Sequence, residues 1–256
     1  MDLFTGVGVA LVTLLDDAGG VDAAATGSLA ADLVSRGMQA VLACGTTGEP
    51  GTLTDAERLE VIRAVRDAVP PGVPVLAGTG AISLARAAEL TAAAAAAGAD
   101  AVLAWPPPGC DDLAGYYAEL GRVVGDRPVL AYHIPWISSP GIPVSELGGL
   151  PVAGLKDSSG DPDRLLAEVA RYPGRTYIGS SALLALAGPL GGTGAILAVA
   201  NVEPELCCTA FAGDAGAQLK LTDVHLAARE GGVPALKQIL AEQRGTVPLS
   251  RPQARL

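Results

Sequence analysis

The sequence contains few of the residues that build metal sites, disulfide frameworks or aromatic binding surfaces. Its 256 residues include two histidines and four cysteines, and Phe, Trp and Tyr together account for 4%. The cysteines show no Cys-x-x-Cys spacing, so we expect no metal site and small buried thiols in a reducing compartment. They are Cys44, Cys110, Cys207 and Cys208.

An excess of positive charge is also missing. The formal net charge is −10 at pH 7, which argues against nucleic acid and anionic membranes as partners, because both attract basic patches. No secretory signal is visible, since Asp2 stands where a basic residue belongs and the apolar stretch 6–15 is short. The charge-free segment 176–202 is interrupted at 188–194, which indicates helix, turn and strand instead of a membrane span. We therefore expect a soluble, cytoplasmic protein.

The sequence is rich in short apolar runs separated by helical patterns. Eight runs are typical of buried β-strands. Two helix starts have capping chemistry: Thr54 and Glu57 fit a capping box, and Asp161 precedes a proline at the first helical position. The runs cover residues 7–14, 40–43, 73–77, 101–104, 129–132, 152–156, 176–179 and 194–197, and the helices include 55–69, 84–97, 113–124 and 162–170.

This alternation predicts an α/β fold in which a parallel sheet is covered by helices. Eight repeats within about 200 residues favour a (β/α)8 TIM barrel, whose functional groups gather at the C-terminal ends of the strands. A doubly wound open sheet is the alternative. We expect a single domain over residues 1–256, with the barrel in approximately 1–200 and a shortened C-terminal helical extension in approximately 201–256, containing helices at 219–230 and 233–243.

Lys156 closes the sixth apolar run and is followed by the turn-rich stretch Asp157-Ser158-Ser159-Gly160. An ammonium group is costly to desolvate, so burial at a strand end favours the neutral amine. A neutral lysine amine can attack a carbonyl carbon and form a Schiff base. Lysines at strand ends also commonly point into solvent, and position alone leaves both interpretations open.

Two further groups are expected at the same end of the predicted barrel. The turn Gly45-Thr46-Thr47-Gly48 follows the second run, and its amides and hydroxyls suit a carboxylate, although an ordinary turn has the same composition. Tyr132 ends the fifth run; its hydroxyl either passes protons beside a partner such as Thr46 or is simply packed and satisfied. With an activated lysine, these groups describe a site for a 2-oxo acid.

Four motifs in this order make the chain comparable with a known family. They are Gly45-Thr46-Thr47-Gly48-Glu49, Tyr132-His133-Ile134-Pro135, Gly154-Leu155-Lys156-Asp157-Ser158-Ser159-Gly160, and Gly194-Ala195-Ile196 followed by Ala200-Asn201-Val202. In these motifs the chain resembles the dihydrodipicolinate synthase / N-acetylneuraminate lyase family of Schiff-base, pyruvate-handling barrel enzymes. The resemblance runs from about residue 6 to 202, and residues 233–237 are similar to the family's late helix.

The resemblance implies a role for each site residue. Lys156 would be the Schiff-base nucleophile, Tyr132 the general acid and base, and Thr46 a member of the proton relay. The iminium formed with pyruvate would act as an electron sink when a carbon–carbon bond is made or broken, so the resemblance implies neither a metal nor an organic cofactor. The residues that would bind pyruvate are Gly45, Thr47, Gly48 and Ile196.

The chain departs from the family's pattern in four places. Trp136-Ile137 stand where synthases of lysine biosynthesis carry an arginine for the carboxylate of aspartate semialdehyde. Residues 105–109 replace a usual tyrosine pair, while Tyr116 and Tyr117 come later, on the next predicted helix. Leu14 replaces a proline. The short tail argues against the family's usual tetramer and leaves the size of a homo-oligomer open.

Three functional hypotheses follow. The first is a pyruvate-dependent aldolase or lyase, for which the apolar Trp136 and Ile137 favour an aldehyde without a second charge. The second is 4-hydroxy-tetrahydrodipicolinate synthase. The third is a catalytically impaired paralogue that binds a 2-oxo acid or assembles with a competent homologue; the missing tyrosine pair favours it, whereas the retained Lys156 and Tyr132 oppose it.

Overall fold

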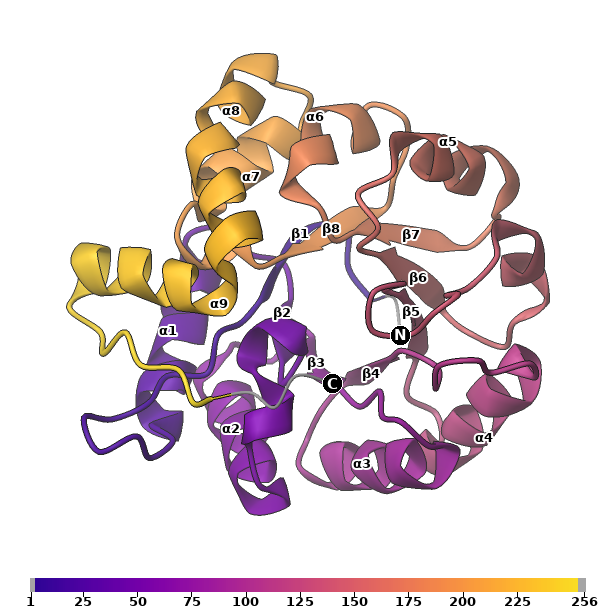
Figure 1. Ribbon diagram of the computed structural model, residues 1–256, viewed down its shortest axis with the longest axis horizontal. Coiled ribbons are helices and arrows are strands. Elements are labelled where there is room, and N and C mark those ends of the chain that lie inside the picture. The colour runs from indigo at the N-terminus through magenta and orange to yellow at the C-terminus, as the bar shows by residue number, and fades with distance from the viewer. Residues whose placement is uncertain (1–2, 253–256) are drawn as a thin grey trace.

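Eight parallel strands close into a barrel, and helices surround it (Figure 1). The structure is a computed structural model and describes residues 3–252. Because β1 pairs with β8, the predicted (β/α)8 barrel is confirmed and the open sheet is excluded. The strands are β1 (Gly6–Ala10), β2 (Val41–Ala43), β3 (Val75–Gly78), β4 (Ala101–Ala104), β5 (Val129–His133), β6 (Gly154–Asp157), β7 (Arg175–Ile178) and β8 (Gly194–Leu197).

The helices begin where their capping residues predict. Thr54 and Glu57 form the expected capping box at the start of α2, and the Asp161 carboxylate accepts the first amides of α5. The two helices expected near the end of the chain are the two halves of α9, which breaks at Gly232. The helices are α1 (Ala23–Ser35), α2 (Asp55–Ala68), α3 (Leu84–Ala96), α4 (Leu113–Val124), α5 (Pro162–Arg171), α6 (Leu184–Ala187), α7 (Pro204–Phe211), α8 (Ala215–Lys220) and α9 (Thr222–Arg244).

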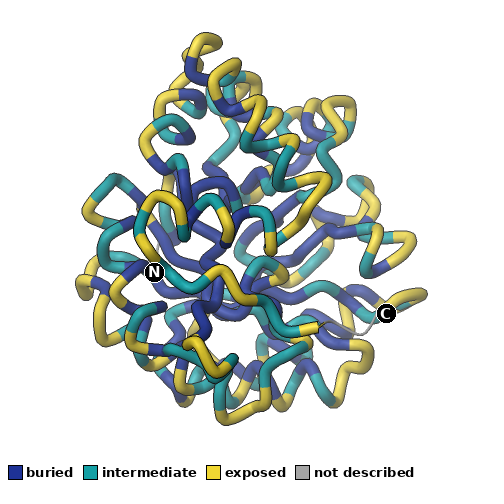
Figure 2. The backbone as a smooth tube through the Cα atoms, turned by 60° about the vertical axis from the view of Figure 1, so that its left-hand side comes forward, coloured by how far each residue is buried: buried dark blue, intermediate teal, exposed yellow. Residues whose placement is uncertain are grey.

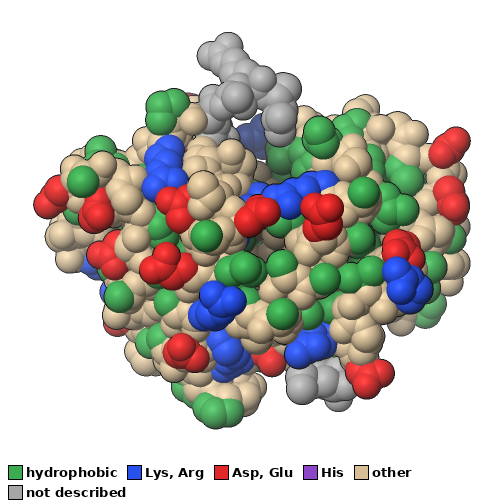
Figure 3. Space-filling model, turned by 90° about the horizontal axis from the view of Figure 1, so that it is seen from below, with side chains coloured by type: hydrophobic (Ala, Val, Ile, Leu, Met, Phe, Trp, Pro, Cys, Tyr) green, Lys and Arg blue, Asp and Glu red, His purple; other side chains and the backbone are tan. Residues whose placement is uncertain are grey.

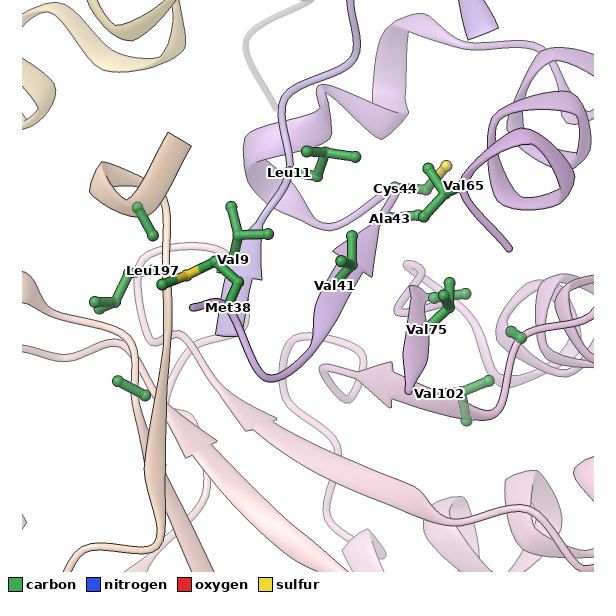
Figure 4. Packing of buried hydrophobic residues seen from close by; sticks show 14 of the residues in the cluster. Val9, Leu11, Met38, Val41, Ala43, Cys44, Val65, Val75, Val102 and Leu197 are labelled. Carbon is green, nitrogen blue, oxygen red and sulfur yellow. The ribbon is translucent and has the colours of Figure 1, made fainter. Parts of the chain in front are cut away.

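The core has two layers, because side chains alternate between the two faces of each strand. Inside the barrel, residues such as Leu42, Leu103 and Leu130 form one buried cluster. Outside it, the alternate strand residues pack against the helices. Figure 4 shows part of this outer layer, including Val41 of β2 and Val65 of α2. The buried strands lie at the centre of the molecule and the exposed segments at its periphery (Figure 2).

The first strand ends earlier than predicted. Residues 11–14 stay buried, but they leave the ladder after Ala10. The side chain of Asn201 takes over there: its oxygen accepts from Val12 N at 3.1 Å, and its nitrogen donates to Ala10 O at 2.8 Å. Asn201 is fully buried, so these bonds fasten the ends of β1 and β8 together.

An ion pair between Asp157 of β6 and Arg164 of α5 holds α5 against the outer side of the barrel. Asp157 points outward from β6, and burial raises its pKa. It lies 3.8 Å from the Arg164 guanidinium, which in turn contacts the Glu168 carboxylate at 2.8 Å. Burial, together with the negative charge of Asp157, raises the pKa of Glu168 to about 8.

A buried ion pair ties α9 to the turn after β2. Lys237 Nζ lies 2.5 Å from a carboxylate oxygen of Glu49, and both side chains are almost fully buried. Burial lowers the pKa of Lys237. The same ammonium group donates to Leu249 O at 2.8 Å, and Arg251 pairs with Glu57 of α2 at 2.7 Å. Residues 249–251 therefore lie beside α2 and the turn after β2.

No helix within residues 3–252 is long and apolar enough to cross a membrane. The charge-free segment 176–202 instead contains most of β7, then α6 and β8. All four cysteines are free thiols; Cys44 and Cys207 are buried, and burial raises the pKa of Cys44 to about 12.

Replacing Lys237 by Met should destabilise the fold strongly. Glu49 would remain buried without its partner, which costs about 3–5 kcal/mol. The double variant E49Q/K237M removes both charges and should recover much of that loss. Urea unfolding of the wild type, both single variants and the double variant measures the coupling. A loss below about 1 kcal/mol in K237M, as is usual for exposed pairs, would contradict this account.

His133 should make the fold sensitive to mild acid. Its Nδ1 accepts a hydrogen bond from Ile142 N at 2.9 Å, and burial, with a smaller effect of the Arg164 charge, lowers its pKa from 6.5 to about 4. Between these values the unfolded chain binds a proton that the folded chain excludes. The free energy of unfolding should therefore fall as the pH falls from 6.5 to about 4, by about 3 kcal/mol in total.

The variant H133N provides the control for this pH dependence. Asparagine retains an acceptor for Ile142 N but cannot take up the proton. Thermal or urea unfolding at several pH values should give a flatter acid limb for H133N than for the wild type. Parallel curves for the two proteins would show that other groups cause the acid dependence.

Candidate active site

The register between β5 and β6 sets Tyr132 directly beside Lys156. Both residues occupy inward-facing positions of the barrel, and each is 4% exposed. Lys156 Nζ lies 4.6 Å from the centre of the Tyr132 ring. Both side chains line a cavity of about 560 Å³, a volume within the usual range of ligand sites.

Three other predicted site residues also line this cavity. Thr46 and Thr47 reach it from the turn after β2, and Ile196 reaches it from β8. Thr46 is exposed, Thr47 is partly buried and Ile196 is 1% exposed. Five of the seven predicted site residues thus line the same cavity.

The other two predicted residues, Gly45 and Gly48, shape the turn and do not line the cavity. A Cβ on Gly45 would lie 2.7 Å from a methyl group of Leu42, so a larger residue there would require the buried Leu42 side chain to move. Gly48 accepts a hydrogen bond at its carbonyl from the hydroxyl of Thr13, at 2.9 Å. Thr13 precedes Leu14, the residue that replaces the family's proline, and it anchors the turn to the end of β1.

The turn is a single 3-10 turn over Thr46–Gly48. The amide of Gly48 donates to Gly45 O, and the amide of Glu49 donates to Thr46 O. Those two amides already donate within the turn, so they are not available to a bound carboxylate and the predicted carboxylate site has fewer donors than expected. Within residues 3–252, the amides of Thr46 and Thr47 donate to no protein group, so they are the ones available to a bound anion.

Ser158 is a site residue that the sequence interpretation missed. Its hydroxyl donates to the Tyr132 hydroxyl at 3.3 Å, and Ser158 lines the cavity. A signal was present in the sequence: residues two apart in an extended segment point to the same side, so Ser158 follows Lys156 on the inner face. Tyr132 thus has a hydroxyl partner from the loop after β6, whereas within residues 3–252 no hydrogen bond joins it to Thr46, the partner expected from the resemblance.

The late tyrosines do not reach the cavity. Tyr116 and Tyr117 lie on α4, as predicted, and their hydroxyls donate to backbone carbonyls of Trp105 and Ala104 at 2.9 and 3.0 Å. Burial raises the pKa of both phenols. They therefore anchor α4 to the segment around the end of β4, and they cannot replace the tyrosine pair that the family carries after the fourth strand.

The remaining wall of the cavity comes from residues that were not among the seven predicted site residues. Trp136 lines the cavity and is 64% exposed, whereas Ile137 packs against the inner cluster of the barrel. The loops after β6 and β7 add serine hydroxyls. Helix α9 borders the cavity and contributes polar and apolar side chains. These residues are Ser158, Ser159, Ser180, Ser181, His225, Ala228, Arg229, Gly232, Val233 and Leu236.

The residues of the cavity are those of covalent and acid–base chemistry. A buried lysine amine, a phenol and several hydroxyls meet at the C-terminal ends of the strands. Within residues 3–252, no group of three or more His, Cys, Asp and Glu side chains is arranged to hold a metal ion.

Comparison with known proteins agrees with this arrangement. The family model described as the dihydrodipicolinate synthetase family matches residues 3–226. A 4-hydroxy-tetrahydrodipicolinate synthase of Thioalkalivibrio sulfidiphilus is 37% identical over 231 residues, which cover 84% of this chain and 78% of that protein. The synthase of Thermus thermophilus is 38% identical over 212 residues, covering 77% and 71%.

Solved structures lead to the same family. The dihydrodipicolinate synthase of Acinetobacter baumannii complexed with pyruvate superposes with a TM-score of 0.84 at 27% identity, covering 94% of this chain and 89% of the other. The dihydrodipicolinate synthase of Aquifex aeolicus superposes with a TM-score of 0.81 at 30% identity, covering 92% and 87%. Since the family match spans most of a barrel that places the motif residues around one cavity, the chain belongs to the dihydrodipicolinate synthetase family.

Proposed function

We propose that this protein is a carbon–carbon lyase that binds pyruvate as a Schiff base on Lys156 and makes or breaks a bond to an aldehyde. The observation that carries the proposal is the position of the Lys156 amine, buried in the cavity 4.6 Å from the Tyr132 ring. The pyruvate complex of the related Acinetobacter enzyme supports the choice of 2-oxo acid.

The chain has only three lysines, and this narrows the choice of nucleophile. Lys220 is exposed at the end of α8, and Lys237 is paired with Glu49. Lys156 alone among the three lines the cavity. Its amine is therefore the lysine amine placed to attack a carbonyl carbon in the cavity.

The first half of the reaction forms the covalent adduct. The Lys156 amine attacks C2 of pyruvate, and loss of water gives an iminium. Thr47 and the free amides of the turn hold the carboxylate, while Ile196 packs against the small acid. Tyr132 transfers the protons that carbinolamine formation and dehydration require, with Ser158 and Thr46 as hydroxyl partners.

The second half uses the iminium as an electron sink. Loss of a proton from C3 gives an enamine, which attacks the aldehyde carbonyl; in the reverse direction, cleavage of the bond at C3 leaves the same enamine. Hydrolysis of the product iminium then frees Lys156. Every step is accounted for by Lys156, proton-transferring hydroxyls and water, so the proposed reaction requires neither a metal nor an organic cofactor.

Two other functions remain as alternatives. Synthesis of 4-hydroxy-tetrahydrodipicolinate is favoured by the names of the relatives, whereas Trp136-Ile137 in place of an arginine weighs against it. A catalytically impaired paralogue is favoured by the lost tyrosine pair, but the Ser158–Tyr132 hydrogen bond gives the phenol a partner of another origin. Assembly into a homo-oligomer and a cytoplasmic location stay predictions.

Pyruvate and borohydride together should modify Lys156. Reduction of the iminium fixes pyruvate on the amine, and peptide mass spectrometry assigns the adduct among the three lysines. The variant K156A should lose the adduct and all turnover, with unchanged far-UV circular dichroism. K220A, which removes an exposed lysine, should be labelled like the wild type. A folded wild-type protein without an adduct at Lys156 would refute the proposed function.

An aldehyde panel separates the lyase from the synthase. With pyruvate in excess, consumption of several aldehydes other than aspartate semialdehyde is expected, measured by product mass. If aspartate semialdehyde alone reacts, the synthase is the correct function. If pyruvate is trapped on Lys156 but no aldehyde reacts in either direction, the chain is the impaired paralogue.

A further inference from the structure

The cavity is much larger than pyruvate requires, and its far side is polar. Its volume of about 560 Å³ suits a ligand of several times the size of a three-carbon acid. Ser159, Ser180 and Ser181 line it from the loops after β6 and β7, and the Ser159 hydroxyl donates to Asp157. A second substrate that occupied this space would meet hydrogen-bond donors and acceptors.

One face of α9 completes this polar side. His225 and Arg229 are one turn apart, so they lie on the same helix face, and Ala228 and Gly232 share it. Gly232 has φ 62° and ψ −148°, a conformation essentially confined to glycine, and the resulting break allows both halves of α9 to contribute to the cavity.

The position of His225 is fixed by a hydrogen bond. Its Nδ1 lies 2.9 Å from the hydroxyl of Ser181, which is itself 4% exposed. Burial, with the positive charge of Arg229 added, lowers the pKa of His225, so a neutral ring is favoured. Arg229 is different: within residues 3–252 its guanidinium forms neither an ion pair nor a side-chain hydrogen bond.

The charge of the cavity is opposite to that of the chain. The chain has 27 acidic and 17 basic residues, and both kinds are interspersed on the face shown in Figure 3. Among the described residues that line the cavity, none is Asp or Glu, whereas Lys156 and Arg229 are both present. Such a cavity favours anionic ligands, and one carboxylate of pyruvate leaves Arg229 without a counter-ion.

We infer that Arg229, with Ser181 and His225 beside it, binds an anionic group at the far end of the second substrate. The inference rests on the proposed Schiff-base function and specifies its substrate class: an aldehyde, or the 2-oxo acid formed from it, that ends in a carboxylate or a phosphate. This substrate class differs from the aldehyde without a second charge that Trp136 and Ile137 alone favoured.

Trapping by borohydride tests this without knowledge of the aldehyde. The concentrations of 2-oxoglutarate, 2-oxoadipate and 2-oxopimelate that give half-maximal labelling of Lys156 are compared with those of neutral-tailed 2-oxo acids of matching length. At one length or more, the wild type should need about tenfold less of the dicarboxylate. R229M should lose this preference, R229K should retain part of it, and all variants should trap pyruvate like the wild type.

A second measurement distinguishes carboxylate from phosphate. Turnover of pyruvate with glyceraldehyde 3-phosphate is compared with glyceraldehyde, and turnover with succinate semialdehyde is compared with butanal. The pair with the larger Arg229-dependent difference in kcat/KM identifies the anion. R171M removes an exposed arginine from the end of α5, outside the cavity, and should behave like the wild type in both measurements.

The outcomes separate this inference from the proposed function. If pyruvate labels Lys156 but no anionic tail is preferred in either measurement, the anion site is refuted and the Schiff-base function stands. The same holds if the preference survives in R229M. If no 2-oxo acid labels Lys156 in a folded protein, the proposed function fails, and the inference fails with it.

Discussion

The pairing of β5 with β6 is the constraint on which the rest of the site depends. Tyr132 is opposite Lys156, and their neighbours His133 and Asp157 are also opposite each other. Because side chains alternate, the first pair must face the interior of the barrel when the second pair faces the helices. A shift by one residue would bury the phenol and amine against α5 and turn the outer charged residues into the cavity. Closure of the barrel prevents such a shift, since every strand is held on both sides.

The turn that faces Lys156 is held in place by contacts from distant parts of the chain. Thr13, in the segment after β1, holds Gly48, and Lys237 of α9 holds Glu49. A surface turn normally moves on a short timescale because few buried contacts restrain it. Here a buried hydroxyl holds Gly48, the last residue of the helical turn, and a buried ion pair holds Glu49 directly after it, so the C-terminal end of the turn is fixed before any ligand arrives. Such preorganisation is what electrostatic stabilisation of a bound carboxylate and its reaction requires.

The extent to which the site could be predicted from sequence differs between its two sides. Lys156, Tyr132 and the threonines lie at or just after apolar runs whose length and composition define buried strands, so barrel geometry alone assembles them. His225 and Arg229 have no such position. They lie on a helix outside the barrel, and only the packing of α9 beside the cavity brings them to it. Periodicity predicts that a helix exists, but it does not predict which turn of that helix meets a strand end that is distant in the sequence.

The same difference explains why the sequence and the structure lead to different substrates. In the sequence, Trp136 and Ile137 shortly after Tyr132 are apolar, and of these two Trp136 lines the cavity. The structure adds the opposite wall, where Arg229 has no counter-ion and the serines and His225 supply neutral hydrogen-bonding groups. In a chain with a net charge of −10, a cavity without carboxylates concentrates anions against the overall repulsion of the protein. The apolar wall and the cationic wall are compatible if the substrate is apolar or uncharged near the new bond and charged at its end. The arrangement then selects substrates by length as well as charge, because only a chain that spans the distance from the Lys156 adduct to α9 can contact both.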